Sequence, residues 1–393
     1  MQVHCVCNGL GFPLGTASTQ RIMLLGRALQ ESGTPFHVWH IGTSFIPGNT
    51  LKKGARDGVT WEYLSPAIDR PDNRLIRYFY FLYGALQLPL RLWPARKNAK
   101  VLLYSDGGLL HLWMIACCRM LGIPTAQECC EWWPGTPRQT LLNRWMYRSV
   151  IFRWSQGALP NSRLIETRIR RSAKAGYPIL RIPILVDPAE VMREKERAPQ
   201  TPGSDQPYLF WCGVLDSYLP DALFLVRVLG CLSRGRINPP RLVLAGPCGE
   251  KTREALAEES AKAGLADGQL ILTGFIEESE VFRLATHAQL SLLPLWDDDR
   301  SQSRFPTKLG LYAAAGRPVV ASPIGEIPHF LEDDETALFA AGDEAAWSRT
   351  ILRLLEEEGL ARKIAVGMEK KFLPQVEFRN FGPSLKSWFE NLG

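Results

Sequence analysis

The feature that most constrains this fold is a repeated alternation of short apolar segments with amphipathic ones. A first series of apolar segments runs from 2–7 and 36–40 to 180–182, and a second runs from 208–212 to 318–321. Alternating strands and helices are typical of parallel α/β sheets. The 393 residues are also enough for two such domains. We therefore predict an α/β protein with two Rossmann-like, doubly wound domains that face each other across a cleft.

The predicted domain boundaries follow from composition. Residues 188–206 are rich in Pro, Glu, Lys and Arg and separate the two series, as expected of a linker. We predict an N-terminal domain over 1–187 and a C-terminal domain over 207–371. The last segment, 372–393, is aromatic and is predicted to be helical. It either packs on its own domain or crosses back to the N-terminal domain.

Charge is unevenly distributed between the two halves. Residues 1–187 carry 23 Lys+Arg against 10 Asp+Glu, whereas residues 188–393 carry 23 against 30. A basic domain favours an anionic partner. No recognition-helix, zinc-finger or RNP-type pattern is present, so we expect no nucleic acid. An anionic membrane surface is the partner we expect instead.

Two basic, aromatic segments, 74–100 and 138–153, are the candidates for that membrane contact. Their composition suits helices that lie at an anionic lipid interface. The alternative is a buried helix whose long basic side chains reach water at its ends. The longest apolar runs, 78–90 and 107–118, are shorter than the roughly 20 residues needed to span a bilayer. We expect peripheral binding at the inner membrane face.

Cysteine usage and carboxylate spacing argue against a metal site. The nine cysteines show no C-x-x-C spacing, and the first residues lack a secretion-signal pattern, so we expect reduced thiols and a cytoplasmic location. Carboxylates at Asp297–Asp299 could bind Mg²⁺ in principle. We interpret them as a solvated acidic loop and predict no metal.

A glycine-rich loop, Gly9 to Gly15, lies between the first predicted strand and a helix over 18–31. Backbone N–H groups at such a helix start can face a diphosphate. The spacing differs from G-x-G-x-x-G, and a tight strand-to-helix turn explains the glycines equally well. Gly15 is our candidate ligand contact in this loop.

The most informative stretch is 303–322. Pro306 fits the opening of a helix, Gly316 ends that helix, and an apolar strand follows at once. Arg304, Thr307 and Lys308 lie at the predicted helix start, where basic side chains and amides can hold phosphates.

This stretch resembles the donor-binding segment of family 4 glycosyltransferases, K-L-x-E-Y-x-A-A-G-x-P-V-V-A-S. Further pieces agree with that family in order along the chain, namely 127–134, 182–187, Gly213, 242–246, 273–276 and 325–328. The resemblance implies the two-domain GT-B fold and a role in polysaccharide or glycolipid biosynthesis. It implies a metal-independent hexosyltransferase that acts with retention, without a cofactor other than its UDP- or GDP-sugar donor, on a glycan or lipid-linked acceptor.

The resemblance also implies roles for single residues. The backbone at Gly274, Phe275 and Ile276 would contact the base, Gly213 would lie by the donor, and Lys308 and Thr307 would lie at the diphosphate. Glu326 is a candidate sugar contact. In the N-terminal domain, Glu131 follows a predicted strand and precedes Trp132 and Trp133. It could orient or deprotonate an acceptor hydroxyl, or it could be a surface glutamate beside buried tryptophans.

The chain departs from the family pattern at two places. The paired glutamates of the family fall at Ser303 and Leu311, and the basic pair after Gly213 is replaced by Val214 and Leu215. Two alternatives therefore stay open beside a transferase. One is a catalytically silent GT-B domain that binds a partner or a sugar nucleotide, and the other is a sugar-nucleotide epimerase.

Overall fold

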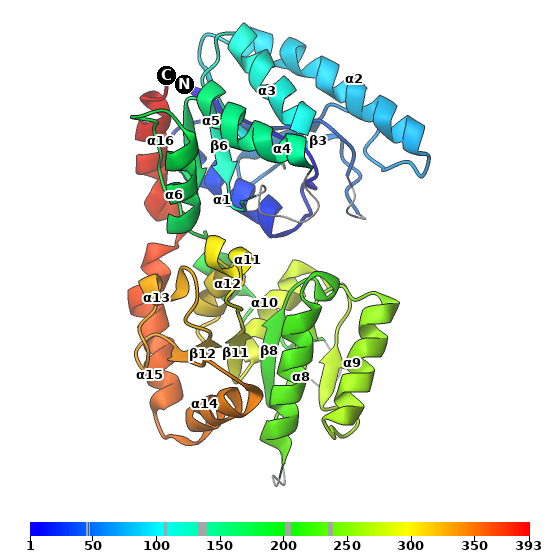
Figure 1. The fold of residues 1–393 in the computed structure, drawn as a ribbon, viewed down its shortest axis with the longest axis vertical. Coiled ribbons are helices and arrows are strands. Elements are labelled where there is room, and N and C mark those ends of the chain that lie inside the picture. The colour runs from blue at the N-terminus through cyan, green and yellow to red at the C-terminus, as the bar shows by residue number, and fades with distance from the viewer. Residues whose placement is uncertain (45, 47, 106–107, 133–139, 201–205, 235–238) are drawn as a thin grey trace. The chain divides into compact units, whose positions relative to one another are not determined.

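The computed structural model describes residues 1–393 except 45, 47, 106–107, 133–139, 201–205 and 235–238 (Figure 1). Of the predicted features, residue 107 of the apolar run, residues 133–134, the first two residues of 138–153 and residues 201–205 of the predicted linker therefore lie outside the described residues. The chain divides into two compact units. The first unit comprises Met1–Leu185, Ser303–Phe305 and Phe378–Gly393, and the second comprises Val186–Gln302 and Pro306–Glu377.

The first unit is built on a seven-stranded sheet in the order β3-β4-β2-β1-β5-β6-β7. Only β3 is antiparallel to its neighbour. The strands are β1 (Gln2–Cys7), β2 (Phe36–His40), β3 (Lys53–Arg56), β4 (Val59–Tyr63), β5 (Ala99–Tyr104), β6 (Thr125–Cys129) and β7 (Gly157–Pro160). The central strands are buried on both faces, as expected of a parallel sheet covered by helices.

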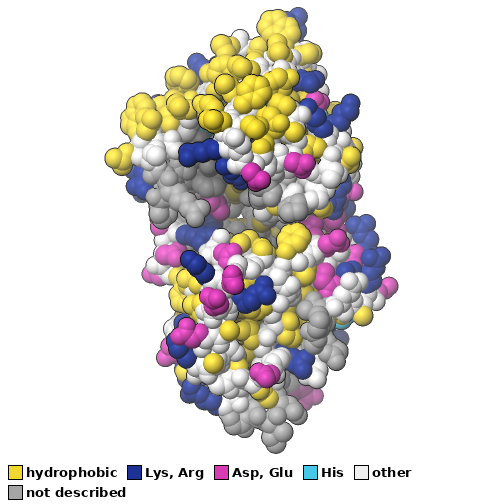
Figure 2. Space-filling model, turned by 90° about the vertical axis from the view of Figure 1, so that its right-hand side faces the viewer, with side chains coloured by type: hydrophobic (Ala, Val, Ile, Leu, Met, Phe, Trp, Pro, Cys, Tyr) yellow, Lys and Arg dark blue, Asp and Glu magenta, His cyan; other side chains and the backbone are white. Residues whose placement is uncertain are grey.

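Helices cover both faces of this sheet (Figure 1). They are α1 (Ala17–Glu31), α2 (Arg74–Leu92), α3 (Gly108–Met120), α4 (Leu141–Met146), α5 (Phe152–Trp154), α6 (Arg163–Ser172) and α16 (Gly382–Glu390). One hydrophobic core joins α1 and α16 to the sheet, and another joins α2 and α3 to it. Hydrophobic side chains also gather on the surface of this unit (Figure 2).

The end of the chain belongs to the first unit. Leu385 and Phe389 of α16 are buried in the same core as Leu25 of α1. The Lys386 ammonium donates to the carbonyl of Ser32, at 3.1 Å. Of the two arrangements considered for 372–393, residues 378–393 thus pack with the N-terminal sheet.

The second unit has a six-stranded, fully parallel sheet in the order β10-β9-β8-β11-β12-β13. Its strands are β8 (Tyr208–Cys212), β9 (Arg241–Ala245), β10 (Leu270–Leu272), β11 (Leu290–Leu293), β12 (Val319–Ala321) and β13 (Leu338–Phe339). Its helices are α7 (Pro188–Arg193), α8 (Leu219–Ser233), α9 (Glu250–Lys262), α10 (Glu278–His287), α11 (Asp299–Ser303), α12 (Lys308–Ala314), α13 (Ile327–Phe330), α14 (Glu344–Glu356) and α15 (Leu360–Gly367).

The start of the segment interpreted as a linker is folded. Asp187 caps α7 by accepting from the amide of Ala189, and Glu194 forms an ion pair with Arg283 at 2.7 Å. Arg283 also pairs with Glu280, and all three side chains are largely buried. The charges that gave 188–206 its linker-like composition therefore attach part of it to α10 of the second unit.

Within the described residues, no helix is both long enough and apolar enough to cross a bilayer.

Candidate functional site

Three neighbouring strands of the second sheet end on glycines. Gly213 follows β8, Gly246 follows β9, and Gly274 lies two residues beyond the end of β10. A side-chain carbon on Gly246 would lie 2.0 Å from the Gly213 carbonyl oxygen, so the two backbones approach too closely for any other residue. The carboxyl edge of a parallel sheet is where α/β folds bind ligands. At the ends of β8, β9 and β10 this edge presents glycine backbone without side chains.

The loop after β10 is held by Thr273. Its hydroxyl accepts from the amide of Gly246 at 3.2 Å and donates to the carbonyl of Gly274 at 2.8 Å. Gly274 has a left-handed backbone, with φ of 67°. The Phe275 ring that follows is 68% exposed. An exposed ring at a strand end offers a flat apolar surface to a planar ligand.

Lys308 lies over the end of β8. Its ammonium is 3.7 Å from the centroid of the Trp211 ring and 5.1 Å from that of Tyr218. The guanidinium of Arg300 lies 4.5 Å from the Tyr218 ring and donates to the carbonyl of Ser217 at 3.2 Å. These distances are within the range of cation–π attraction. Two aromatic rings therefore hold two cations near the glycine edge.

Tyr312 fixes α12, and with it Lys308, against β8. The amide of Cys212 donates to the Tyr312 hydroxyl at 3.2 Å. Burial raises the pKa of Tyr312 well above its ordinary value, and burial also raises the pKa of the Cys212 thiol, with the nearby Lys308 charge opposing that shift. Both groups stay neutral at physiological pH, so Lys308 supplies the positive charge at this strand end.

The amides near Thr307 are partly used within the chain. Those of Leu309 and Gly310 donate to the carbonyls of Pro306 and Thr307. That the amides near Thr307 and the Lys308 side chain contact a diphosphate stays a prediction. Arg304 belongs to the short stretch 303–305 that groups with the first unit.

Asp216 stands close to where the family pattern has cations. It is exposed and accepts from the amide of Gly249, which precedes α9, at 3.0 Å. Hydrogen bonds from Thr252 and from the Gly249 amide hold the pKa of Asp216 below its ordinary value. The negative charge of Asp216 therefore interacts favourably with the positive end of the α9 dipole, at the amino terminus of that helix.

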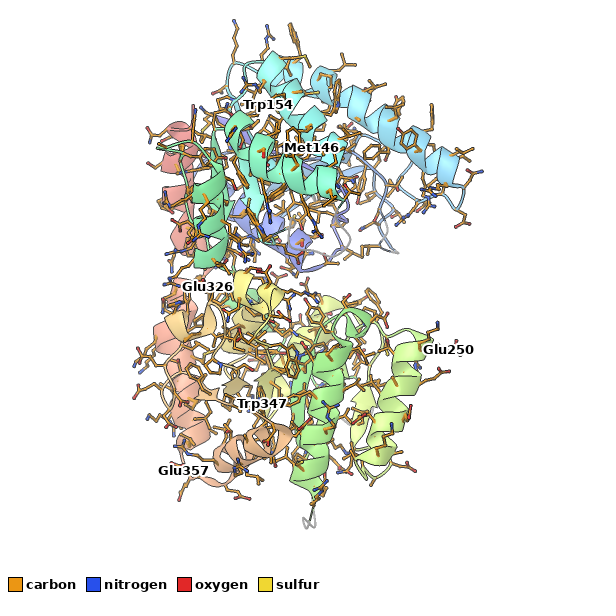
Figure 3. All side chains as sticks on the ribbon, in the orientation of Figure 1. Met146, Trp154, Glu250, Glu326, Trp347 and Glu357 are labelled. Carbon is orange, nitrogen blue, oxygen red and sulfur yellow. The ribbon has the colours of Figure 1, made fainter. Side chains whose placement is uncertain are left out.

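Glu326 lies in a turn before α13 and is 2% exposed (Figure 3). The preceding Gly325 has φ of 63°, and a side-chain carbon on it would lie 2.6 Å from the carbonyl oxygen of Ser301 in α11. The turn is therefore packed against α11, and Glu326 is part of a rigid region instead of an open loop.

Two amides of the glycine-rich loop in the first unit donate to side chains of the same unit. The amide of Phe12 donates to the Tyr63 hydroxyl at 2.8 Å, and that of Leu14 donates to the Asn49 side chain at 3.0 Å. These amides are satisfied by protein, which favours the strand-to-helix turn as the reason for the glycines. Gly15 is exposed and lies two residues before α1, whose N-cap is Thr16.

The buried carboxylate at the end of β6 is Glu128. It pairs with Arg21 of α1 at 2.6 Å, and Arg21 also donates to the carbonyls of Ile182 and Pro183. Burial raises the pKa of Glu128, and Arg21 opposes the shift. Glu131 lies three residues on and is partly buried. Its charge contributes to the raised pKa of Tyr104, which is due mainly to burial.

A polar cluster on the α3 side of this sheet was largely missed by sequence reasoning. The His111 Nε2 atom lies 2.5 Å from the Gln127 side-chain oxygen. The other His111 nitrogen, the Gln127 amide nitrogen and the Ser105 hydroxyl are buried without a hydrogen-bond partner in the described structure. Burial lowers the pKa of His111 to about 4, so the ring is neutral. Buried polar atoms of this kind normally bind a ligand or water.

Two carboxylates of the acidic run at 297–299 accept hydrogen bonds from residues a few positions further along the chain. The Asp298 carboxylate accepts from the amide of Ser301 at 2.6 Å, and Asp297 accepts from the Gln302 side chain at 2.8 Å. Over the part of the chain that the structure describes, no group of three or more His, Cys, Asp and Glu side chains could hold a metal ion.

Comparison with known proteins agrees with this picture. The family model described as "Glycosyl transferases group 1" matches residues 206–357, in the second unit. No match was found among curated proteins. The structure of sucrose-phosphate synthase from Thermosynechococcus elongatus is similar with a TM-score of 0.77 and 16% identity, over 99% of this chain and 98% of that one.

Two further solved structures cover all of both chains. Anabaena HepE in complex with UDP and glucose has a TM-score of 0.71 at 11% identity. Trehalose-6-phosphate synthase OtsA has a TM-score of 0.72 at 13% identity. The predicted fold class and the resemblance to GT-B glycosyltransferases are confirmed: the chain has the GT-B fold, with two parallel-sheet α/β domains.

Proposed function

We propose that this protein transfers a sugar from a UDP- or GDP-sugar to a glycan or lipid-linked acceptor at the cytoplasmic face of a membrane. The observation that carries the proposal is the pair of cations, Lys308 and Arg300, held by Trp211 and Tyr218 beside the glycine edge of the second sheet. A diphosphate needs positive charge and close backbone approach. This edge offers both.

The donor is proposed to lie along that edge. Its base would stack near Phe275, with backbone contacts at Gly274 and Ile276, and its diphosphate would reach Lys308 by way of Gly213. Structures of HepE contain UDP, UDP-glucose, or UDP with glucose, which makes a uridine donor the first to test. Glu326 is the proposed sugar contact.

The chemistry requires no metal if Lys308 supplies the charge. As the bond between the anomeric carbon and the diphosphate oxygen breaks, negative charge develops on the diphosphate, and a positioned cation stabilises it. A new bond forms between the same carbon and an acceptor oxygen. We propose that the configuration is retained and that Glu131 orients the acceptor hydroxyl or takes up its proton.

The first unit is proposed to bind the acceptor. Ser105, His111 and Gln127 present buried polar atoms that lack partners in the described structure, which suits a ligand rich in hydroxyl groups. Neutral His111 can donate or accept a hydrogen bond, depending on its tautomer.

A transfer assay tests this function. The full-length protein is incubated with isotope-labelled UDP-sugars and GDP-sugars and a membrane lipid extract, and the lipid and glycan fractions are counted. We expect label in one of these fractions with one nucleotide class, and its loss in Lys308→Ala. Matched Lys262→Ala, at the far end of α9, should keep the activity because Lys262 pairs with Glu258 on the surface.

One alternative has a specific basis. Leu311 and Val214 stand where the family pattern has a glutamate and a cation, which would suit a catalytically silent domain that still binds a nucleotide or a partner. Nucleotide binding without transfer to any fraction would favour this alternative. Release of an epimerised sugar without an acceptor would instead indicate an epimerase.

A further inference from the structure

Helix α2 has two apolar faces, and one of them has no protein against it in the described structure. Its inner face is buried through Gly84, Ala85, Leu88 and Leu92. Gly84 touches the backbone of the neighbouring segment, because a side-chain carbon there would lie 2.0 Å from the Ile41 carbonyl oxygen. The inner face alone explains how this helix is attached to the first unit.

The outer face of α2 is an apolar stripe of six residues spaced three or four apart, which places them along one side of the helix. They are Leu75 at 79% exposure, Phe79 at 59%, Leu82 at 46%, Leu86 at 55%, Leu90 at 66% and, just beyond the helix, Trp93 at 55%. Exposed stripes of this length in soluble domains mark an interaction surface.

Helix α4 carries a second exposed apolar cluster. Leu141 is 81% exposed, Leu142 is 56% and Trp145 is 59%. Helix α3 packs against both α2 and α4, so the two clusters lie on helices of the same unit that share α3 as a neighbour. Together they form what we call the apolar surface, defined by the six residues of the α2 stripe and these three. Hydrophobic side chains are gathered over this unit in Figure 2.

The segments that carry the apolar surface are basic, and the acidic residues nearest to them are Asp72, which precedes α2, and Glu62 of β4, which pairs with Arg91 at 3.0 Å. Residues 74–105 contain no Asp or Glu but include Arg74, Arg77, Arg91, Arg96 and Lys97, and residues 132–165 also contain no acidic residue. The Arg96 guanidinium lies 3.9 Å from the Trp93 ring, so that a cation and an aromatic side chain occur together at the end of the stripe.

We propose that the apolar surface inserts into the outer part of an anionic lipid bilayer, with α2 lying flat in the membrane plane. This deepens the proposed function, on which it rests, by assigning the membrane contact to named residues. A stripe about 27 Å long on one helix, with Trp and Tyr nearby and basic residues at its ends, fits an interfacial helix. A protein partner would require a matching hydrophobic groove with an acidic rim, whereas anionic lipid offers both features over any area.

Vesicle sedimentation of the full-length protein tests the proposal. We expect binding to vesicles of phosphatidylcholine mixed with phosphatidylglycerol, weaker binding at high salt, and little binding to phosphatidylcholine alone. Leu86→Ser should weaken binding about tenfold, and Leu86→Ser combined with Leu90→Ser by more. Both side chains are exposed, so folding should be unchanged, which a thermal melt checks. Leu51→Ser, an equally exposed leucine outside the apolar surface, is the matched control.

The outcomes separate this inference from the proposed function. If the folded protein does not sediment with anionic vesicles but still shows a melting shift with a nucleoside diphosphate, the membrane assignment is wrong and the donor site stands. If it dimerises and Leu86→Ser makes it monomeric without any vesicle binding, the apolar surface is an interface between copies and the proposal fails. Vesicle binding that Leu86→Ser leaves unchanged would also overturn it.

Discussion

At the carboxyl edge of the second sheet, β8, β9 and β10 end near glycines, whereas at the same edge of the first sheet β5 and β6 end near large polar side chains. In the second unit, cations come from outside the strands and rest on Trp211 and Tyr218. In the first, Gln127 and Glu128 point from adjacent positions of β6 to His111 on one face and Arg21 on the other.

The difference corresponds to two kinds of recognition. Exposed glycine backbone with cations held beside it suits a charged ligand that must come close and leave as a diphosphate. Rigid, buried side chains suit the discrimination of hydroxyl groups, because an unpaired buried donor or acceptor is penalised. On this view the first unit depends on buried polar side chains and the second on backbone approach and charge.

Acid should unfold the first unit before the second. Burial lowers the pKa values of His4, His37, His40 and His111 to about 4, all in the first unit. The unfolded chain therefore takes up protons first as pH falls below about 6.5, and stability present above that pH is lost towards pH 4, by up to about 1.4 kcal/mol per pH unit for each histidine. Pulse proteolysis at several pH values, with the surviving fragments identified by mass spectrometry, measures which unit unfolds first. Simultaneous loss of both units would contradict it.

Removing Arg21 should strongly destabilise the first unit. Arg21→Met leaves the buried Glu128 carboxylate without its cation and the carbonyl of Ile182 without a donor. The loss should be about 3–5 kcal/mol in urea unfolding. Arg21→Met combined with Glu128→Leu should recover part of it, because no uncompensated charge remains. An additive double variant would show that the pair is not coupled.

Gly246→Val should destabilise the second unit by about 2–4 kcal/mol, since its side chain would collide with the Gly213 carbonyl and φ there is 141°. The same variant should abolish nucleotide binding. Gly268→Ala is the control, because it also has a positive φ but open space around it. Equal losses in the two variants would mean that backbone strain, and not the close approach, is responsible.

Lys308→Ala should weaken binding of a nucleoside diphosphate roughly tenfold to a hundredfold, as expected for the loss of about 1.5–3 kcal/mol from a charged contact. Binding of the monophosphate should change less, and stability hardly at all. Calorimetric titration of both ligands gives the comparison. A similar loss for both ligands would place Lys308 away from the terminal phosphate.

The fold could be predicted from the sequence because the turn and helix-boundary residues agree with it. Glycines after apolar strands marked the sheet edge, and Pro306 and Gly316 bounded the turn and helix that carry Lys308. The attachment of Glu194 to Arg283 could not be predicted, since this pair joins residues far apart in the chain. The glycine-rich loop was likewise ambiguous because Tyr63 and Asn49, which satisfy its amides, lie well downstream.

The site itself could be predicted only in part. Lys308 was predicted as a site residue from its motif. Its cation–π contacts with Trp211 and Tyr218 could not be predicted, because they depend on how α12 packs against β8. The cluster of Ser105, His111 and Gln127 has no motif, because the three residues come from separate elements that only the sheet brings together. The assigned roles of Gly15, Glu131 and Glu326 remain predictions.

The central claim is that the second unit binds a nucleoside diphosphate through Lys308. A thermal-shift panel of UDP, GDP, ADP, TDP and CMP, run on the protein and on Lys308→Ala, tests it most directly. A ligand that binds only the folded state at a hundredfold excess over Kd stabilises by about 2.7 kcal/mol. We expect a clear rise in Tm with UDP or GDP and a much smaller rise in Lys308→Ala. No shift with any nucleotide, in a protein that melts cooperatively, would contradict the account.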